Sequence, residues 1–436
     1  MQGRKYWGVA TAPAGFSISR VMMWSRRFLA GPRRRCLEGQ IGWRGSKTRA
    51  PFGHRWAILA LALWSVQAVA LPYVPTRDSE VLERVPARSA LDRLEPLRRT
   101  VAANPRNLTA TLELAKGYLQ IGRAAGDPRF VAYAQATLLP WLRDGNAPEP
   151  VLVLQATALQ NQHQFAAAMN LLDRAMKLNA SDPQVWLTRA TIYSLRDDLA
   201  NARSACARLT RTADTLVALT CLAEIDSRNG RLSASFEALR RVFVDDARLP
   251  VELRVWVLTQ LSDMAERLGN DLAAQQYLQA ALQATPDDGF SLAAYADLLI
   301  RERRYPEVIS LLAGREAQDN LLLRLSIAGQ GSGSPEGRRW SDMYAARVQA
   351  AQRDGDIVHL REQAMFALDV QHDSAHALQI AAQNWQQQRE PADVRVYLRA
   401  ARAVHGSAGG ELREVPLRQW LASTHYEDAT LAQVHK

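Results

Sequence analysis

Oppositely charged side chains recur along the middle of the chain at a spacing that suits a binding surface. At corresponding positions of three successive segments, an acid precedes an arginine by four residues, which puts both side chains on one face of a helix. The pairs are Glu224 with Arg228, Asp263 with Arg267, and Asp297 with Arg301. Repeated in register, they would form two rows of charge that can hold an extended peptide or its terminal carboxylate. The alternative is ordinary support of a solvated helix face, worth about 0.2–0.5 kcal/mol per pair.

Aromatic and polar residues at similar positions would extend this surface. Arg353, Trp385 and Gln386 follow later in the chain, and Trp256 and Phe290 lie within the charged region. Exposed aromatics would suit a peptide-binding surface, although aromatics at helical spacing more often belong to a core. The predicted groove residues are therefore Glu224, Arg228, Asp263, Arg267, Asp297, Arg301, Arg353 and Trp385.

One histidine pair has a spacing that metal sites use. His372 and His376 are four residues apart, with Asp369 and Asp373 nearby, and could place two imidazoles on one ion. The same stretch also fits a helix start, with Asp373 or Ser374 as the N-cap. Because a third ligand is not evident, we predict no metal and no cofactor. Nor do we predict catalytic residues, since the chain lacks a zinc-protease pair, a nucleophile elbow and a catalytic cysteine with an assignable histidine.

Two of the three cysteines lie in the central region, on successive predicted helices. A disulfide between Cys206 and Cys221 would form in an oxidising compartment and contribute about 3 kcal/mol for a loop of this length. The alternative is two free thiols, because cysteine is a common small residue of buried cores.

A unit of about 34 residues positions these candidates. The pattern of small and large apolar residues returns at Glu149, Pro183, Leu216, Val255 and Gly289. This period predicts a stack of helical hairpins, which offers a binding surface rather than a catalytic pocket. In the second of these units, Ala202, Cys206 and Leu209 form the apolar stripe of the second helix.

The units resemble the tetratricopeptide repeat (TPR) family. Trp186, Ala190 and Tyr193 follow that family's scheme of an aromatic, a small residue and a tyrosine, and a later unit has Gly269 at its turn and Pro286 at its end. The resemblance implies an all-α, right-handed superhelical solenoid of antiparallel helix pairs, whose first helices line a concave groove. The alternative is an irregular all-helical domain.

The resemblance covers about residues 107–405, with further units at Leu108, Ser341 and Ser374. Helices at both ends would cap the stack, because its terminal faces are apolar. We expect a leader over 1–70, a capping helix in 71–106, repeats over 107–328, a Gly/Ser-rich loop at 329–338, repeats over 339–405 and a second capping helix in 406–436.

Charge is distributed unevenly between the leader and the rest of the chain. Residues 1–70 hold 12 lysines and arginines and one acid, Glu38, whereas the rest holds 42 basic and 43 acidic residues. The net charge of +10 therefore belongs to the leader, and a nucleic-acid partner lacks electrostatic support.

The leader is typical of an export signal. An apolar run over 56–66 precedes Ala68-Val69-Ala70, small residues that signal peptidase accepts. We expect cleavage near Ala70 and a periplasmic protein. A membrane anchor is the alternative, but the 15 residues over 56–70 fall short of the roughly 20 that span a bilayer.

We therefore expect an exported, non-enzymatic scaffold or adaptor in the cell envelope. It would bind a protein or peptide segment in its groove, and would associate peripherally with a membrane complex. The alternatives are the same scaffold anchored by an uncleaved leader, and an enzyme or enzyme accessory whose repeats form a substrate channel beside a carboxylate pair. Two or more ionisable groups with shifted pKa facing one pocket would favour the enzyme, and charges spread along the groove would favour the scaffold.

Overall fold

The computed structural model describes residues 88–143, 145–353, 359–404 and 408–433, which belong to one compact unit. Within these ranges the regular structure is helical, without strands. The first helices along the chain are α2 (Arg88–Ala103), α3 (Leu108–Ala125), α4 (Arg129–Leu142), α5 (Glu149–Asn161), α6 (Phe165–Leu178), α7 (Pro183–Leu195), α8 (Leu199–Thr212), α9 (Thr215–Ser227), α10 (Leu232–Val242) and α11 (Val251–Arg267). The remaining ones are α12 (Asp271–Ala284), α13 (Gly289–Arg301), α14 (Tyr305–Leu312), α15 (Asp319–Ser332), α16 (Glu336–Arg353), α17 (Leu360–Asp369), α18 (Ser374–Asn384), α19 (Pro391–Ala403), α20 (Ala408–Ser423) and α21 (Thr430–Gln433).

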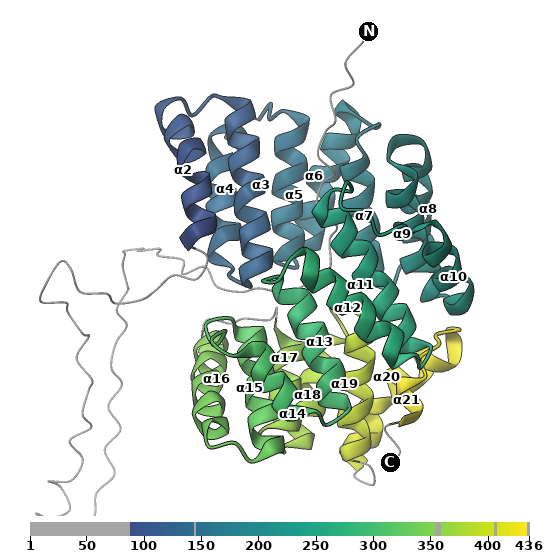
Figure 1. Cartoon of the computed structure of the whole chain (residues 1–436). Helices are drawn as coiled ribbons and strands as arrows, with labels where there is room; N and C mark the ends of the chain where they lie inside the picture. Colours follow the sequence, from purple (N-terminus) through teal and green to yellow (C-terminus); the bar gives the residue numbers. More distant parts are fainter. Residues whose placement is uncertain (1–87, 144, 354–358, 405–407, 434–436) are drawn as a thin grey trace, which may run out of the picture. The chain divides into compact units, whose positions relative to one another are not determined.

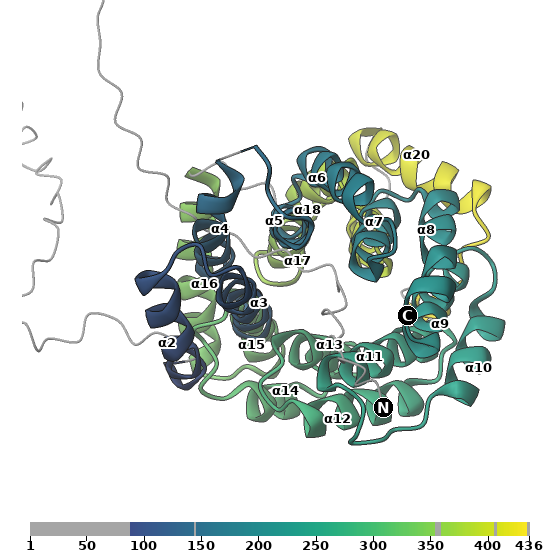
Figure 2. The same cartoon turned by 90° about the horizontal axis from the view of Figure 1, so that it is seen from above.

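From α3 to α20 these helices form antiparallel hairpins, each odd-numbered helix packing on the even-numbered helix that follows it. The hairpins follow a right-handed superhelix, with odd-numbered helices on its inner side and even-numbered ones outside (Figure 2). Later repeats pass beneath the earlier ones, so that α13 contacts α3 (Figure 1). This is the stack of helical hairpins that the period predicts, and the all-α, TPR-like solenoid that the resemblance implies.

Local sequence explains where the first helix of a hairpin begins and how the helices pack. The side chains of Asp182, Asp214 and Asp288 cap α7, α9 and α13 by accepting hydrogen bonds from backbone N–H groups of the first turn. The small residues of the repeat pattern, such as Ala190 and Ala265, are buried where helices cross. Small side chains let the helix backbones approach, and larger neighbours fill the grooves at packed density.

In the hairpins from α3–α4 to α17–α18, the turn between the two helices contains one residue with a left-handed backbone. Glycine supplies it after α9 and α11, where Gly230 and Gly269 have φ of 71° and 77°. Four other turns use a residue with a side chain at this position: His163, Asp197, Arg303 and His372. His372 is therefore part of a hairpin turn, and Asp373 is the N-cap of α18, accepting a hydrogen bond from the His376 backbone N–H.

The Gly/Ser-rich loop predicted at 329–338 is instead mostly helical. Helix α15 continues to Ser332, Gly333 ends it with φ of 69°, and α16 begins at Glu336. The glycines allow these helices to cross closely, since a Cβ atom on Gly329 would lie 2.5 Å from the Cα atom of Gly337.

Because these residues are helical, the later repeats begin at other residues than the sequence predicts. Units begin with α15, α17 and α19, whereas the predicted starts, Ser341 and Ser374, lie inside α16 and at the first residue of α18. The placements at Glu149, Pro183 and Gly289 coincide with the first residues of α5, α7 and α13.

Helices at both ends cover the repeats. Leu91, Leu94 and Leu97 of α2 pack on the first part of the core, and Trp420 of α20 contacts the ring of Trp385. The predicted leader over 1–70 and its cleavage site lie outside the described residues. A search of the described helices found none with the length and apolar character to span a bilayer.

The C-terminal segment packs on earlier repeats of the superhelix. We call residues 420–433 the C-terminal clasp. The Ala429 backbone N–H donates a 2.7 Å hydrogen bond to the Arg267 carbonyl at the end of α11. His425 packs on Gly230, where an added Cβ would lie 2.6 Å from the His425 Cβ. The clasp thus rests on the hairpin turns that follow α9 and α11.

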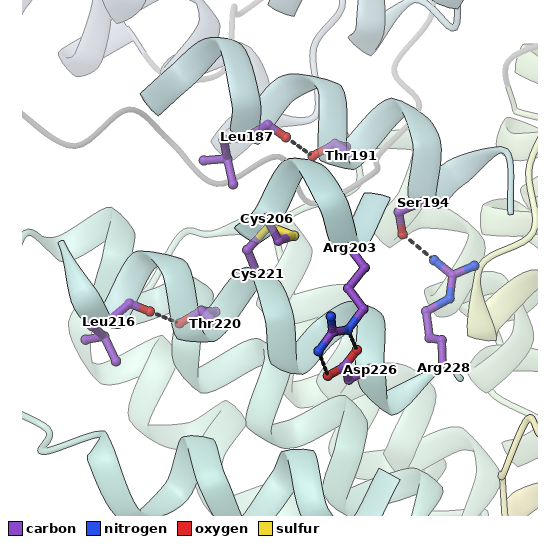
Figure 3. The surroundings of a disulfide bond; sticks show 10 residues. All are labelled: Leu187, Thr191, Ser194, Arg203, Cys206, Leu216, Thr220, Cys221, Asp226 and Arg228. Carbon is purple, nitrogen blue, oxygen red and sulfur yellow. Dashed lines mark hydrogen bonds and ion pairs between the residues drawn. A yellow bond between two sulfur atoms is a disulfide. The ribbon is translucent and has the colours of Figure 1, made fainter. Parts of the chain in front are cut away.

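Cys206 and Cys221 form a disulfide bond in this structure (Figure 3). Their Cα atoms are 5.5 Å apart, and both residues are buried. Because Cys206 is on α8 and Cys221 on α9, the bond links one hairpin to the next.

Candidate ligand-binding cavity

A cavity of about 160 Å³ lies among the inner helices, and we call it the inner cavity. It is lined mainly by the odd-numbered helices α9, α11, α13, α15, α17 and α19. Five carboxylates and five guanidinium groups line it, together with uncharged residues that include Phe290. The charged residues are Glu224, Asp263, Glu266, Asp297, Glu390, Arg228, Arg267, Arg324, Arg361 and Arg395.

The predicted row of acids is present. Glu224, Asp263 and Asp297 come from three successive first helices and line the same cavity. The predicted partners are mostly wrong, however. Only Asp263 pairs with the arginine four residues later, at 2.9 Å.

Asp297 and Arg301, the third predicted pair, bind side chains of neighbouring repeats and not each other. Asp297 instead binds Arg324 through two hydrogen bonds of 2.6 and 2.8 Å. Arg301 does not line the cavity and pairs with Glu266 and, at 2.6 Å, with Asp271. Neighbouring helices offered these side chains closer partners than their own helix did, which a spacing rule cannot reveal.

Two of the predicted groove arginines hold the superhelix together. Arg228 donates to the Ser194 hydroxyl (Figure 3) and to the backbone carbonyl of Arg389 in the later repeats. Arg267 is 1% exposed and donates to the Ser227 carbonyl at 3.0 Å, while its guanidinium lies 5.7 Å from the ring centre of Tyr426. Alanine variants at these positions would therefore report on folding as well as on binding.

The two remaining predicted groove residues lie elsewhere. Arg353 is exposed on α16, and its Nε atom donates to the Gln349 carbonyl of its own helix. Trp385 is 2% exposed and packs edge-on against Trp420 and Tyr397, so it belongs to the core. Across the described ranges, no group of three or more His, Cys, Asp or Glu side chains could hold a metal ion.

A row of arginines that the sequence analysis missed faces the acid row. Arg324, Arg361 and Arg395 each lie eight residues before the last residue of their helix, in α15, α17 and α19. Their spacing in the sequence, 37 and 34 residues, carries the signal. The phase predicted for the later repeats placed Arg353 and Trp385 at the groove positions instead.

Each arginine of this row is already paired with carboxylates. Arg324 binds Asp297, Arg361 binds Glu390 at 3.0 Å, and Arg395 binds Glu266 at 3.0 Å. Three further carboxylates with little or no exposure pair with Arg361 or Arg395: Glu362, Asp393 and Asp428.

Two glutamates of the cavity titrate near neutral pH. Burial raises the pKa of Glu224 to about 7, against the opposing effect of Arg228, and the charges of Glu390 and Asp263 raise it further. Burial also raises the pKa of Glu390, which Arg361 opposes. The inner cavity thus brings two carboxyl groups with raised pKa to one place.

A larger cavity of about 670 Å³ lies between the first and later repeats. It is lined by parts of α2 and α3 on one side and by residues of α11 and of the turns before α13 and α15 on the other. Arg123 of α3 pairs with Asp288 at 3.4 Å across this seam, and Gln120 donates to Glu252 at 3.3 Å. These two contacts join the first repeats to the later ones.

The fold and its polar inner face define a helical-repeat protein of the TPR-like kind. A scan against protein-family models found no match, and a search of curated proteins matched none. Among solved structures, the APC/C hetero-tetramer Cut9-Hcn1 is similar with a TM-score of 0.38 and 11% identity, over 71% of this chain and 52% of that one. The P58(IPK) TPR domain is similar with a TM-score of 0.21 and 16% identity, over 68% of this chain and 98% of that one.

The chain thus spans about half the length of the Cut9-Hcn1 chain that it matches. The fold assignment rests on the antiparallel hairpins themselves.

Proposed function

We propose that the chain is a scaffold that binds a segment of another protein along its inner face. The observation that supports this most is the convergence of the acid row and the arginine row on a cavity built from first helices. At about 160 Å³ the cavity is smaller than the roughly 300–1,000 Å³ of small-molecule pockets. It has room to anchor a side chain of a longer ligand, whose remainder would lie on the surrounding inner face.

We further propose that this scaffold works in the cell envelope after export, in peripheral association with a membrane complex. The leader composition supports export, and the Cys206–Cys221 disulfide suits an oxidising compartment. N-terminal sequencing of the protein isolated from the native envelope tests this. A start near Leu71 is expected, and an intact leader would favour the membrane-anchored alternative.

Photo-crosslinking tests the binding surface. A benzoyl-phenylalanine at Phe290, which lines the cavity, is expected to crosslink to a discrete partner in intact cells. The matched control is the same substitution at Tyr133, an aromatic residue that is 48% exposed and lies away from the inner cavity. Equal crosslinking at both positions, or none at Phe290, would contradict binding along the inner face.

One observation favours a second candidate function, an enzyme. Glu224 and Glu390 both have raised pKa and line one cavity, which is an arrangement that acid–base catalysis uses. Ion-pair networks that only stabilise a fold also shift pKa, and Glu390 is already paired with Arg361. Time-dependent conversion of a captured ligand by the wild-type chain, abolished in both Glu224→Gln and Glu390→Gln, would establish the enzyme.

A further inference from the structure

The acid row and the arginine row both line the inner cavity. Two members of the acid row form ion pairs with arginines, and the third does not. Asp297 is held by Arg324 at 2.6 Å, and Asp263 by Arg267 at 2.9 Å. Glu224 is the third member of the acid row. Among the described residues, none forms an ion pair or a hydrogen bond with its carboxylate.

The nearest cations are engaged with other groups. Arg228, four residues along the chain, directs its guanidinium to the Ser194 hydroxyl and the Arg389 carbonyl. Arg361 is shared by Glu390, Asp393 and a third acid, Glu362. A rearrangement that brought either arginine to Glu224 would leave buried acceptors or carboxylates without a donor, which is costly.

Carboxylates also outnumber guanidinium groups in the connected cluster. Five of each line the cavity, and three more buried carboxylates, Glu362, Asp393 and Asp428, bind the same arginines. Arg301, which pairs with Glu266, adds only one further cation. The cavity therefore favours an incoming positive charge. A terminal carboxylate would have to displace an internal acid from an arginine that already holds it.

We propose that Glu224 binds the ammonium or guanidinium group of a lysine or arginine side chain that the bound protein segment inserts into the inner cavity. This inference rests on the proposed function. In the sequence-based expectation, the two rows of charge hold an extended peptide or its terminal carboxylate, whereas here the group that is bound is a cation. The cavity's small volume suits a single long side chain.

The test is a selection from a random peptide-display library on the purified chain, followed by affinity measurements on synthetic peptides. Peptides enriched on the wild-type chain are expected to share a lysine or arginine. Glu224→Gln should weaken their binding about 10- to 100-fold, the effect of losing one charge-assisted hydrogen bond. Replacing the basic residue of the peptide by norleucine should weaken wild-type binding similarly and Glu224→Gln binding hardly at all.

Two variants serve as controls. Glu113→Gln makes the same chemical change on the exposed face of α3 and should bind like the wild type. Glu224→Asp keeps the charge and should retain more affinity than Glu224→Gln, which separates loss of charge from loss of folding. Circular dichroism checks that all three variants are folded.

The outcomes separate this inference from the proposed function. Peptides that bind the inner face without a basic residue, or that bind Glu224→Gln as tightly as the wild type, would overturn the inference and leave the scaffold standing. A selection that enriches no inner-face peptide would overturn both.

Discussion

The indole N–H of Trp420 donates a hydrogen bond of 2.6 Å to the carboxylate of Asp197, although the two residues are 223 positions apart. Asp197 sits in the hairpin turn after α7 and also pairs with Arg389 at 3.2 Å. A backbone hydrogen bond joins the same two segments: the Arg389 N–H donates to the Leu195 carbonyl at 2.9 Å. One turn of an early repeat thus holds both the C-terminal clasp and the segment before α19.

We expect Trp420→Phe to lower the free energy of unfolding by about 1–3 kcal/mol, because a mostly buried carboxylate loses a donor while the ring packing is largely kept. Urea denaturation measures the change. Trp186→Phe is the control, since that indole donates at an exposed position to the Ala180 carbonyl. Equal losses in the two variants would show that the bond to Asp197 adds nothing special.

Arg267 should be far more sensitive than its predicted role as a groove residue implies. Arg267→Met removes a buried guanidinium and leaves the Ser227 acceptors without their donor, for an expected loss of about 3–5 kcal/mol. Thermal and urea unfolding would record it. Arg353→Met, on an exposed helix face, should change stability by less than about 0.5 kcal/mol. If Arg267→Met lost no more stability than Arg353→Met, Arg267 would not hold the superhelix together.

The stability cost of Glu224 should depend on pH. Its folded-state pKa of about 7 lies above the ordinary value of 4.5, so the folded chain keeps a proton that the unfolded chain loses between these pH values. Stability therefore falls as pH rises through this window. Arg228 and Arg267 face Glu224 and favour its charged form, whereas Glu390 and Asp263 oppose it.

Glu224→Gln should consequently be more stable than the wild type by about 1–3 kcal/mol at pH 8, and equal to it near pH 4.5. Denaturation curves at pH 4.5, 6 and 8 measure the difference. A gap between the two proteins that stays constant with pH would contradict the raised pKa of Glu224.

Reduction of the disulfide should cost about 3 kcal/mol, because Cys206 and Cys221 close a loop of 15 residues. The measurement is the unfolding midpoint with and without a reductant. The double variant Cys206→Ala with Cys221→Ala should be insensitive to the reductant. A wild-type chain that is equally insensitive, with two titratable thiols in protein from the native envelope, would exclude the bond.

The left-handed turn positions should respond oppositely to glycine. Arg303→Gly relieves the backbone at an exposed residue and should stabilise the fold by about 0.5–1 kcal/mol. Asp197→Gly brings the same relief but removes the contacts to Trp420 and Arg389, and should destabilise it. Thermal melts of the two variants compare them. A gain in both would mean that the Asp197 side chain contributes little.

The local architecture was predictable because it repeats. The period placed α5, α7 and α13 correctly, and the acids Glu224 and Asp263 were recognised as one row. The phase failed at Gly329, because glycine signals a loop in a sequence but here permits a close helix crossing. That single error concealed the arginine row.

Closure of the superhelix lay beyond sequence reasoning for a different reason. Periodicity describes contacts between neighbouring units, whereas Asp197 lies in the α7–α8 hairpin and Trp420 on α20, which are far apart in the array. The pairing of Arg228 with the Arg389 carbonyl has the same origin. Asp197 and Arg228 are typical of surface residues in the sequence. Their partners come from later repeats, which pass beneath the earlier ones.

The hydrogen bond between Asp197 and Trp420 also affects how such a chain can evolve. Open repeat arrays tolerate the duplication or loss of a unit, since each unit contacts only its neighbours. In this array an extra hairpin inserted between α9 and α19 would carry Trp420 one unit past its partner. Change is therefore expected to proceed by substitution within hairpins of fixed number, with gene-level duplication of single repeats selected against.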